Sequence, residues 1–189
     1  MDCTFDLPAR EAICVVDSAV RSLARPSRFH PEDSEQRMDA VQRRLEQMVA
    51  AQGPRRGARR ARAVLRITSG LAESPGESVL RWFVRALGLP APRLQARIAD
   101  PDLSRFYFPD EVWPEFKVLA EFDGQLKYTS PEELWREKQR HDALVRMGWH
   151  TERFIWSDVG DLDALRHRVL TLFPPAAARL WRPMADLWK

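Results

Sequence analysis

The chain has 189 residues, of which 44% are hydrophobic and 30% are charged, and its net charge at pH 7 is +3. This length suits one domain with a helical appendage, and no apolar run is long enough to predict a membrane span. The first residues lack the basic and apolar regions of a signal peptide, so we expect a cytoplasmic protein. Cys3 and Cys14 predict neither a disulfide framework nor a structural zinc site.

The charge is unevenly distributed along the chain. Residues 1–72 contain 13 arginines and 9 acids, whereas residues 73–189 contain 17 basic residues and 18 acids. Much of the excess lies in one segment that contains no acid and holds Arg55, Arg56, Arg59, Arg60, Arg62 and Arg66. Such a segment either contacts nucleic-acid phosphates or forms a solvated helix face or linker. The sequence leaves both interpretations open.

Three helices are predicted for residues 1–72. Apolar residues recur at three- and four-residue spacing over residues 7–24 and again over residues 33–51. The arginine-rich segment then continues as a third helix to about Thr68. This N-terminal region is therefore expected to form a small bundle or to wrap the domain that follows.

A fourth helix is predicted to begin at Ser74 and to run to about Leu87. A serine before the helix, Pro75 at its first position and Glu77 three residues after the serine form the pattern of a capping box. Glu77 is therefore expected to bond the backbone at the start of the helix.

A β-hairpin and a third strand are predicted over residues 93–123. Residues 93–99 alternate in polarity, Asp100-Pro101-Asp102 favours a turn, and an aromatic run then leads to Asp110. The third strand covers residues 117–123, and its alternation sends Glu121 and Asp123 to one face.

These acids predict a metal site. Asp110 would lie close to Glu121 and Asp123 if its strand pairs with the third strand. Converging carboxylates repel one another and lose solvation, which is unfavourable unless a cation neutralises them. A site made only of oxygen ligands suits Mg²⁺ or Mn²⁺.

The rest of the chain predicts a helix over residues 132–147, a fourth strand over 149–156 and a last helix over 161–172. A helix that connects strands three and four implies that they run parallel. We therefore predict an α/β domain over residues 73–175, with a mixed sheet of about four strands, followed by a tail over 176–189.

The residues Pro109-Asp110, Glu121-Phe122-Asp123-Gly124 and Lys127 resemble the PD-(D/E)XK nuclease superfamily, and in particular the small actinobacterial domains related to very-short-patch-repair endonucleases. The resemblance covers roughly residues 73–173. It implies a restriction-endonuclease-like core of order α-β-β-β-α-β and a Mg²⁺-dependent endonuclease acting on DNA. One departure is that Asp123 occupies the position of the motif lysine.

The resemblance also implies roles for individual residues. Asp110, Glu121 and Asp123 would bind the metal, Glu77 would complete the site or orient water, and Lys127 would act on the leaving phosphate or in proton transfer. Further DNA contacts are expected from basic residues of the N-terminal segment and of the helix after the third strand, namely Arg55, Arg56, Arg59, Arg60, Arg136, Lys138 and Arg140.

Several alternatives remain open from the sequence. Gln95 and Tyr128 either support the site or serve in packing, and Lys127 is otherwise an exposed turn lysine. A catalytically weak module that binds nucleic acid or protein, in a defence or toxin–antitoxin context, is the second functional hypothesis. A third hypothesis makes the acids a solvated strand end. DNA is the expected partner, and a homodimer or a partner protein also stays open.

Overall fold

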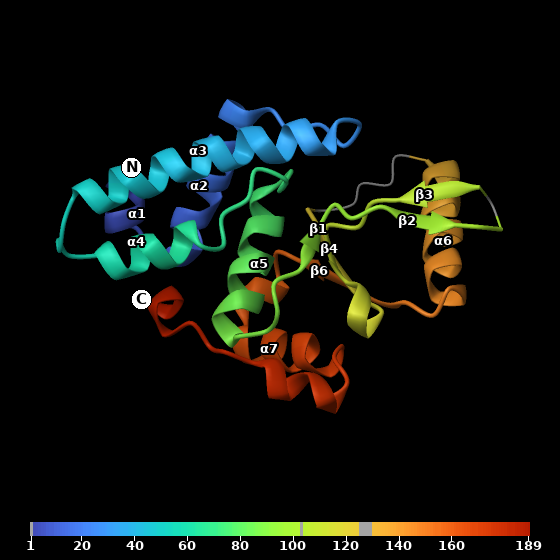
Figure 1. Cartoon of the computed structure of the whole chain (residues 1–189). Helices are drawn as coiled ribbons and strands as arrows, with labels where there is room; N and C mark the ends of the chain where they lie inside the picture. Colours follow the sequence, from blue (N-terminus) through green and yellow to red (C-terminus); the bar gives the residue numbers. More distant parts are fainter. Residues whose placement is uncertain (1, 103, 125–129) are drawn as a thin grey trace. The chain divides into compact units, whose positions relative to one another are not determined.

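A computed structural model describes residues 2–102, 104–124 and 130–189, and these fold into two compact units. The first comprises Met1–Pro90 together with Leu180–Lys189, and the second comprises Ala91–Arg179. Figure 1 shows the helices of the first unit from blue to green and the strands of the second unit from green to orange.

The first unit is helical. Its α-helices are α1 (Asp2–Asp6), α2 (Ala9–Ala24), α3 (Pro31–Ala51), α4 (Ala58–Leu65) and α5 (Pro75–Leu87). The three helices predicted for residues 1–72 are present, and α1 is an additional short one. The apolar face of α2 buries Ile13, Val16 and Val20 as its spacing predicts, but Leu23 is 68% exposed and Ala24 is buried instead.

Helix α5 belongs to this first unit. The sequence placed a domain boundary after residue 72 and treated residues 176–189 as a separate tail, whereas the structure divides after Pro90 and includes the last ten residues in the helical unit. Trp82 of α5 donates a hydrogen bond from Nε1 to the carbonyl oxygen of Leu187 at 2.8 Å, and its ring packs against Trp188. Trp82 and Leu187 are buried, so these contacts attach the chain end to α5, and no local sequence pattern contains that information.

A buried ion pair links α2 to α5. Asp17 is 1% exposed and Arg81 is 4% exposed, and Arg81 donates to the Asp17 carboxylate. Ser78 Oγ and the backbone N–H of Ser69 donate to the same carboxylate at 2.6 and 2.8 Å, and Arg81 Nε donates to the carbonyl oxygen of Ile67 at 2.9 Å. Buried charges are tolerated when paired and hydrogen-bonded in this way.

The second unit is an α/β arrangement. Its strands and α-helices are β1 (Arg93–Leu94), β2 (Ile98–Asp100), β3 (Arg105–Tyr107), β4 (Glu111–Trp113), β5 (Val118–Asp123), α6 (Pro131–Arg146), β6 (His150–Ile155) and α7 (Leu162–Thr171). A mixed four-stranded sheet has the order β1-β4-β5-β6, with β5 parallel to β6 and the other pairs antiparallel. The α/β class, the mixed sheet and the parallel pair joined by a helix are therefore confirmed.

The predicted hairpin is present, but it is interrupted. Its outer part, β2 and β3, forms a separate two-stranded sheet, and its inner part, β1 and β4, joins the main sheet. Gln95 has a positive φ of 50°, which ends the alternation expected over residues 93–99. The single strand predicted there is consequently split into β1 and β2.

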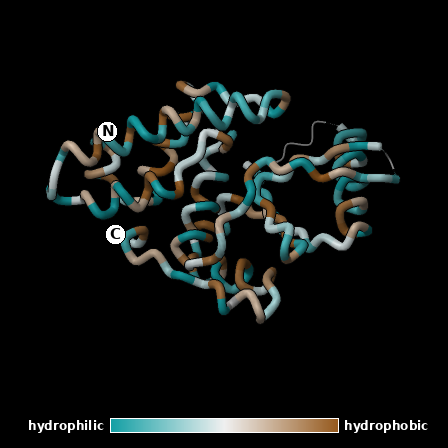
Figure 2. The backbone as a smooth tube through the Cα atoms, viewed as in Figure 1, coloured by the Kyte–Doolittle hydropathy of each residue, from teal (hydrophilic) through white to brown (hydrophobic). Residues whose placement is uncertain are grey.

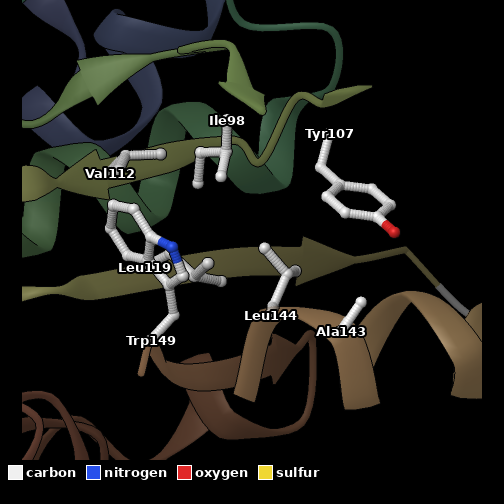
Figure 3. Packing of buried hydrophobic residues seen from close by; sticks show 7 residues of the cluster. All are labelled: Ile98, Tyr107, Val112, Leu119, Ala143, Leu144 and Trp149. Carbon is white, nitrogen blue, oxygen red and sulfur yellow. The ribbon is translucent and has the colours of Figure 1, made fainter. Parts of the chain in front are cut away.

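The core of the second unit lies between the sheet and α6. Its side chains, shown in Figure 3, come from β2, β3, β4, β5 and α6 and from the residue just before β6. They are Ile98, Tyr107, Val112, Leu119, Ala143, Leu144 and Trp149. On the other face of the sheet, the ring of Trp113 packs against the ring of Phe173, which follows the end of α7. The centres of the two rings are 5.1 Å apart. Strand β5 is buried from both sides, which explains its nearly continuous apolar sequence.

Hydrophilic and hydrophobic stretches alternate along the helices in Figure 2. Of the helices that the structure describes, none is both long enough and apolar enough to cross a membrane.

Candidate functional site

The pairing of β4 with β5 brings Asp110 to the acids of β5. The register sets Glu111 opposite Ala120 and Val112 opposite Leu119. Extended by one residue, the same register sets Asp110 opposite Glu121. The predicted proximity of Asp110 to Glu121 is therefore present in the strand register.

Asp110 is held at this place by two hydrogen bonds. Its Oδ2 accepts from the backbone N–H of Phe122 at 2.9 Å, and its Oδ1 accepts from Gln95 Nε2 at 3.2 Å. The backbone N–H of Gln95 also donates to the carbonyl oxygen of Asp110 at 3.2 Å. Gln95 therefore supports the site, and Asp110 connects β5 to the loop that follows β1.

Glu121 lies on the face of β5 that is turned toward α6, where it meets Arg140. Arg140 Nη1 donates to Glu121 Oε2 at 2.9 Å, and Arg140 Nη2 donates to the other carboxylate oxygen. Burial alone would lower the pKa of Arg140, but the hydrogen bonds to Glu121 and the charges of Glu121 and Glu137 outweigh it and raise that pKa. Arg140, predicted to contact DNA, is thus paired inside the protein.

Arg153 of β6 joins this pair to further acids. Its guanidinium lies 3.7 Å from Glu121 and 3.8 Å from Asp123, and it also donates to Glu137. Arg140 donates to the same Glu137 oxygen at 3.3 Å. We call the group formed by Asp110, Glu121, Asp123, Glu137, Arg140 and Arg153 the acid–arginine cluster.

The arginines of the cluster could not be assigned to it from the sequence. Arg153 meets Glu121 because the two are direct partners in the parallel β5–β6 register. Alternation assigned Arg153 to one face of its strand, but only the register selects its neighbour on β5. Glu137 and Arg140 are three residues apart on α6, a spacing that does favour an ion pair.

The composition of the cluster is compatible with a divalent cation. Among the described residues it has four carboxylates and two guanidinium groups, an excess of two negative charges. The Glu121 and Asp123 side chains are only 16% and 13% exposed, so solvent screens this charge incompletely. Oxygen donors of this kind suit Mg²⁺ or Mn²⁺.

The described donors are not arranged as a metal site. In the part of the chain that the structure describes, no three acidic, histidine or cysteine groups stand together in a way that could hold a metal ion. The bidentate pair with Arg140 engages both oxygens of Glu121. The donor set therefore fits Mg²⁺ chemically, and Glu121 would have to exchange Arg140 for the cation.

A groove of about 470 Å³ opens beside the cluster, between α6 and the edge of β6. Glu121, Glu137 and Arg153 contribute to its lining, together with His141 and Thr151. His141 Nδ1 and Thr151 Oγ1 lie 3.2 Å apart, within hydrogen-bonding distance. The polar cluster is thus reachable from one side.

Two predicted site residues are not part of the acid–arginine cluster as described. Lys127, like Tyr128, lies outside the described residues. Glu77 belongs to the first unit, where it accepts from the backbone N–H of Glu73 at 2.8 Å while Ser74 Oγ accepts from the N–H of Glu77 at 3.3 Å. Burial raises the pKa of Glu77, against the opposing effect of these hydrogen bonds. The serine cap predicted from the sequence is confirmed, and the Glu77 carboxylate bonds the backbone one residue before the cap.

The arginines predicted to contact nucleic acid differ in their surroundings. Arg55 lies over the Phe5 ring at 4.3 Å and within 3.7 Å of Asp6, and Arg60 donates to the carbonyl oxygen of Phe5, so both attach α1 to the start of α4. Arg59 lies 4.0 Å from Asp186. A pocket of about 410 Å³ in the first unit is lined by these three arginines, by Arg56 and by Asp186.

The other two basic residues predicted to contact nucleic acid, Arg136 and Lys138, lie on the solvent-exposed side of α6. Arg136 and Lys138 are exposed, and Lys138 Nζ lies 6.0 Å from the centre of the Trp135 ring. They face solvent, whereas Arg140 does not. These three basic residues therefore do not share one face of the helix.

Two uncharacterised proteins from two strains of Mycobacterium tuberculosis are similar to this chain. Each is 33% identical over 140 residues, which is 74% of this chain and 51% of the relative. The chain therefore spans about half the length of the curated relatives it matches. No family profile matches the chain, and no solved structure matches it. The similarity thus connects the chain to mycobacterial proteins without assigning an activity.

Proposed function

We propose that this protein is a metal-dependent endonuclease that hydrolyses phosphodiester bonds in DNA. The observation that carries the proposal is the β4–β5 register, which sets Asp110 opposite Glu121 with Asp123 two residues further along β5. The resemblance of these same residues to the PD-(D/E)XK motif supports it, as does the order of strands around the helix α6. A restriction-endonuclease-like core is part of the same proposal.

Asp110, Glu121 and Asp123 would bind Mg²⁺ or Mn²⁺. When bound, the cation would polarise the phosphate and offset the negative charge that develops in the transition state. Asp110 is fixed in place by Gln95 and by the N–H of Phe122, so its carboxylate needs no large rearrangement. Lys127 would then stabilise the leaving phosphate or take part in proton transfer.

Arg140, which the sequence predicted to contact DNA, has a second role in this scheme. With Glu121 engaged by a cation, the Arg140 guanidinium would lose its bidentate partner. A guanidinium binds a phosphate in the same two-pronged geometry as a carboxylate. Arg140 would therefore contact the DNA phosphate in the loaded site and hold Glu121 in the metal-free one.

The test is a nicking assay on supercoiled plasmid with Mg²⁺ or Mn²⁺. Asp110→Asn and Glu121→Gln keep the shapes of the two side chains and remove their charges. Asp142→Asn is a matched control, because Asp142 is an exposed acid of α6 outside the acid–arginine cluster. Metal-dependent nicking that the first two changes abolish and the third leaves unchanged supports the proposal. Nicking that survives both cluster changes would overturn it.

A second candidate is a nuclease-like module that binds nucleic acid or protein and cleaves little. The pairing of Glu121 with Arg140 and the contact of Arg153 with Glu121 and Asp123 favour it, because internal cations already compensate two of the acids. Asp123 at the motif lysine position favours it too. Protein that shifts DNA in a gel, yet cuts neither plasmid, single-stranded nor mismatched DNA in either metal, would establish this candidate.

A further inference from the structure

We infer that a second groove of the Ala91–Arg179 unit binds the phosphate backbone of a DNA strand. This groove has a volume of about 560 Å³, in the range of ligand-binding clefts. We call it the basic groove. Its lining includes the basic residues Arg93, Arg97 and Lys117 and the apolar residues Ile98, Val112 and Trp149.

The charge of the basic groove is of one sign. Arg93, Arg97 and Lys117 line it and are exposed, and no acid among the described residues lines it. Across the described residues, none of these three cations forms an ion pair with a carboxylate. Arg140, Arg146, Arg153 and Arg168 of the same unit, by contrast, are all paired with acids. The groove thus keeps its positive charge for an external anion.

Aromatic rings position two of these cations. The Arg97 guanidinium lies 3.5 Å from the centre of the Phe106 ring, and Lys117 Nζ lies 4.7 Å from the centre of the Trp149 ring. Such contacts restrict the side chains and leave the charges able to meet an anion. Because Lys117 covers the ring of Trp149, that ring is not available for stacking on a base. The basic groove is therefore expected to contact phosphates, independently of the base sequence.

The floor of the groove is rigid. Ile98, Val112 and Trp149 are at most 9% exposed and belong to the core between the sheet and α6, as Figure 3 shows. A packed core resists deformation, so the three cations are carried on a fixed surface.

The chain segment that carries Asp110 also contributes to the basic groove. Val112 lines it and lies two residues from Asp110 on the same chain segment, a separation of about 7 Å at strand geometry. One DNA strand advances by about 3.4 Å per nucleotide along the duplex axis, so this is about two nucleotide steps. A strand in the groove would therefore reach the acid–arginine cluster. This last placement rests on the proposed nuclease function, whereas binding in the groove does not.

The experiment is fluorescence anisotropy with a labelled 20-nucleotide single strand and a 20-base-pair duplex, in EDTA so that no cleavage occurs. Arg93→Ala, Arg97→Ala and Lys117→Gln are compared with Arg166→Ala, an exposed arginine of α7 outside the groove. Each groove change should lower the slope of log K against log[salt] by about 0.9 for duplex or about 0.7 for single strand. The control should leave the slope unchanged.

The outcomes separate this inference from the nuclease proposal. Groove variants with the wild-type slope, or a wild-type protein without affinity for either DNA, would overturn the inference even if plasmid nicking depends on Asp110. Reduced slopes with a wild-type protein that nicks nothing would support the groove and leave the nuclease proposal without support. Two DNAs of unrelated sequence should bind equally; strong sequence preference would contradict backbone contact. Thermal melting of each variant checks that it is folded.

Discussion

Arg140 and Glu121 are bound to each other through Nη1 and Nη2 of the guanidinium and both oxygens of the carboxylate. The pair joins the middle of α6 to the central strand β5 and lies at the centre of the acid–arginine cluster. A metal at this place and Arg140 would compete for the same carboxylate. The behaviour of this pair therefore decides whether the cluster acts as a metal site or as an internal ion-pair network.

Replacing Arg140 with glutamine should tighten metal binding. The change removes one positive charge beside Glu121, and we expect about tenfold higher affinity for Mn²⁺, equivalent to about 1.4 kcal/mol. Calorimetric titration of the purified protein with Mn²⁺ measures it. Arg168→Gln is the matched control, because Arg168 is also paired with two acids, Glu152 and Asp158, that are not part of the cluster. Weaker Mn²⁺ binding in Arg140→Gln would show that Arg140 supports the site instead of competing for it.

Asp110 should tolerate asparagine better than alanine. Alanine leaves the N–H of Phe122 and the amide of Gln95 without their acceptor, which should cost about 1–3 kcal/mol of unfolding free energy. Asparagine keeps an amide oxygen as an acceptor for one of these donors. Urea denaturation of the two variants gives the difference. Equal stabilities would mean that these hydrogen bonds contribute little, and either variant could then serve in activity tests.

Glu77→Gln should affect stability in a pH-dependent way. Burial raises the pKa of Glu77 in the folded state, so the protonated form favours folding. That contribution is fully present below the ordinary value of 4.5 and is lost as pH rises through the raised pKa. Glutamine keeps an acceptor for the N–H of Glu73 and carries no charge.

We therefore expect Glu77→Gln to be at least as stable as wild type at pH 7, with the difference shrinking below pH 4.5. Denaturation at pH 7 and pH 4 measures it. Mn²⁺ titration of the same variant separates the two predicted roles of Glu77. Unchanged affinity indicates a capping role alone, and lost affinity would place this glutamate in the metal site.

Asp17→Ala should be the most damaging of these changes to the helical unit. It leaves Arg81 buried without its counter-charge and removes the acceptor of Ser78 and of the Ser69 N–H. Breaking a buried pair from one side costs about 3–5 kcal/mol. Chemical denaturation would reveal the loss, and Glu35→Ala on the exposed side of α3 is the control. A loss below about 1 kcal/mol would show that Arg81 finds water or another partner.

The sequence determined the local structure because the relevant forces act between near neighbours. The apolar spacing of α2, the capping box at Ser74 and Glu77, and the alternation of β5 each depend on residues within one or two turns or on one strand. The same alternation placed Glu121 and Asp123 on one face, and the expected pairing of the Asp110 strand with the third strand brought Asp110 near them. The proposed metal site could therefore be formulated before the fold was known.

The tertiary structure decided which charges meet. Arg140 could equally have faced solvent, and only the packing of Ala143 and Leu144 on the sheet turns it toward Glu121. Arg153 meets Glu121 through a strand register that no local pattern specifies. The three cations of the basic groove come from two separate segments, residues 93–97 and Lys117. Alternation and capping are local properties, whereas ion-pair partners depend on the register and packing of distant segments, which the sequence pattern alone does not determine.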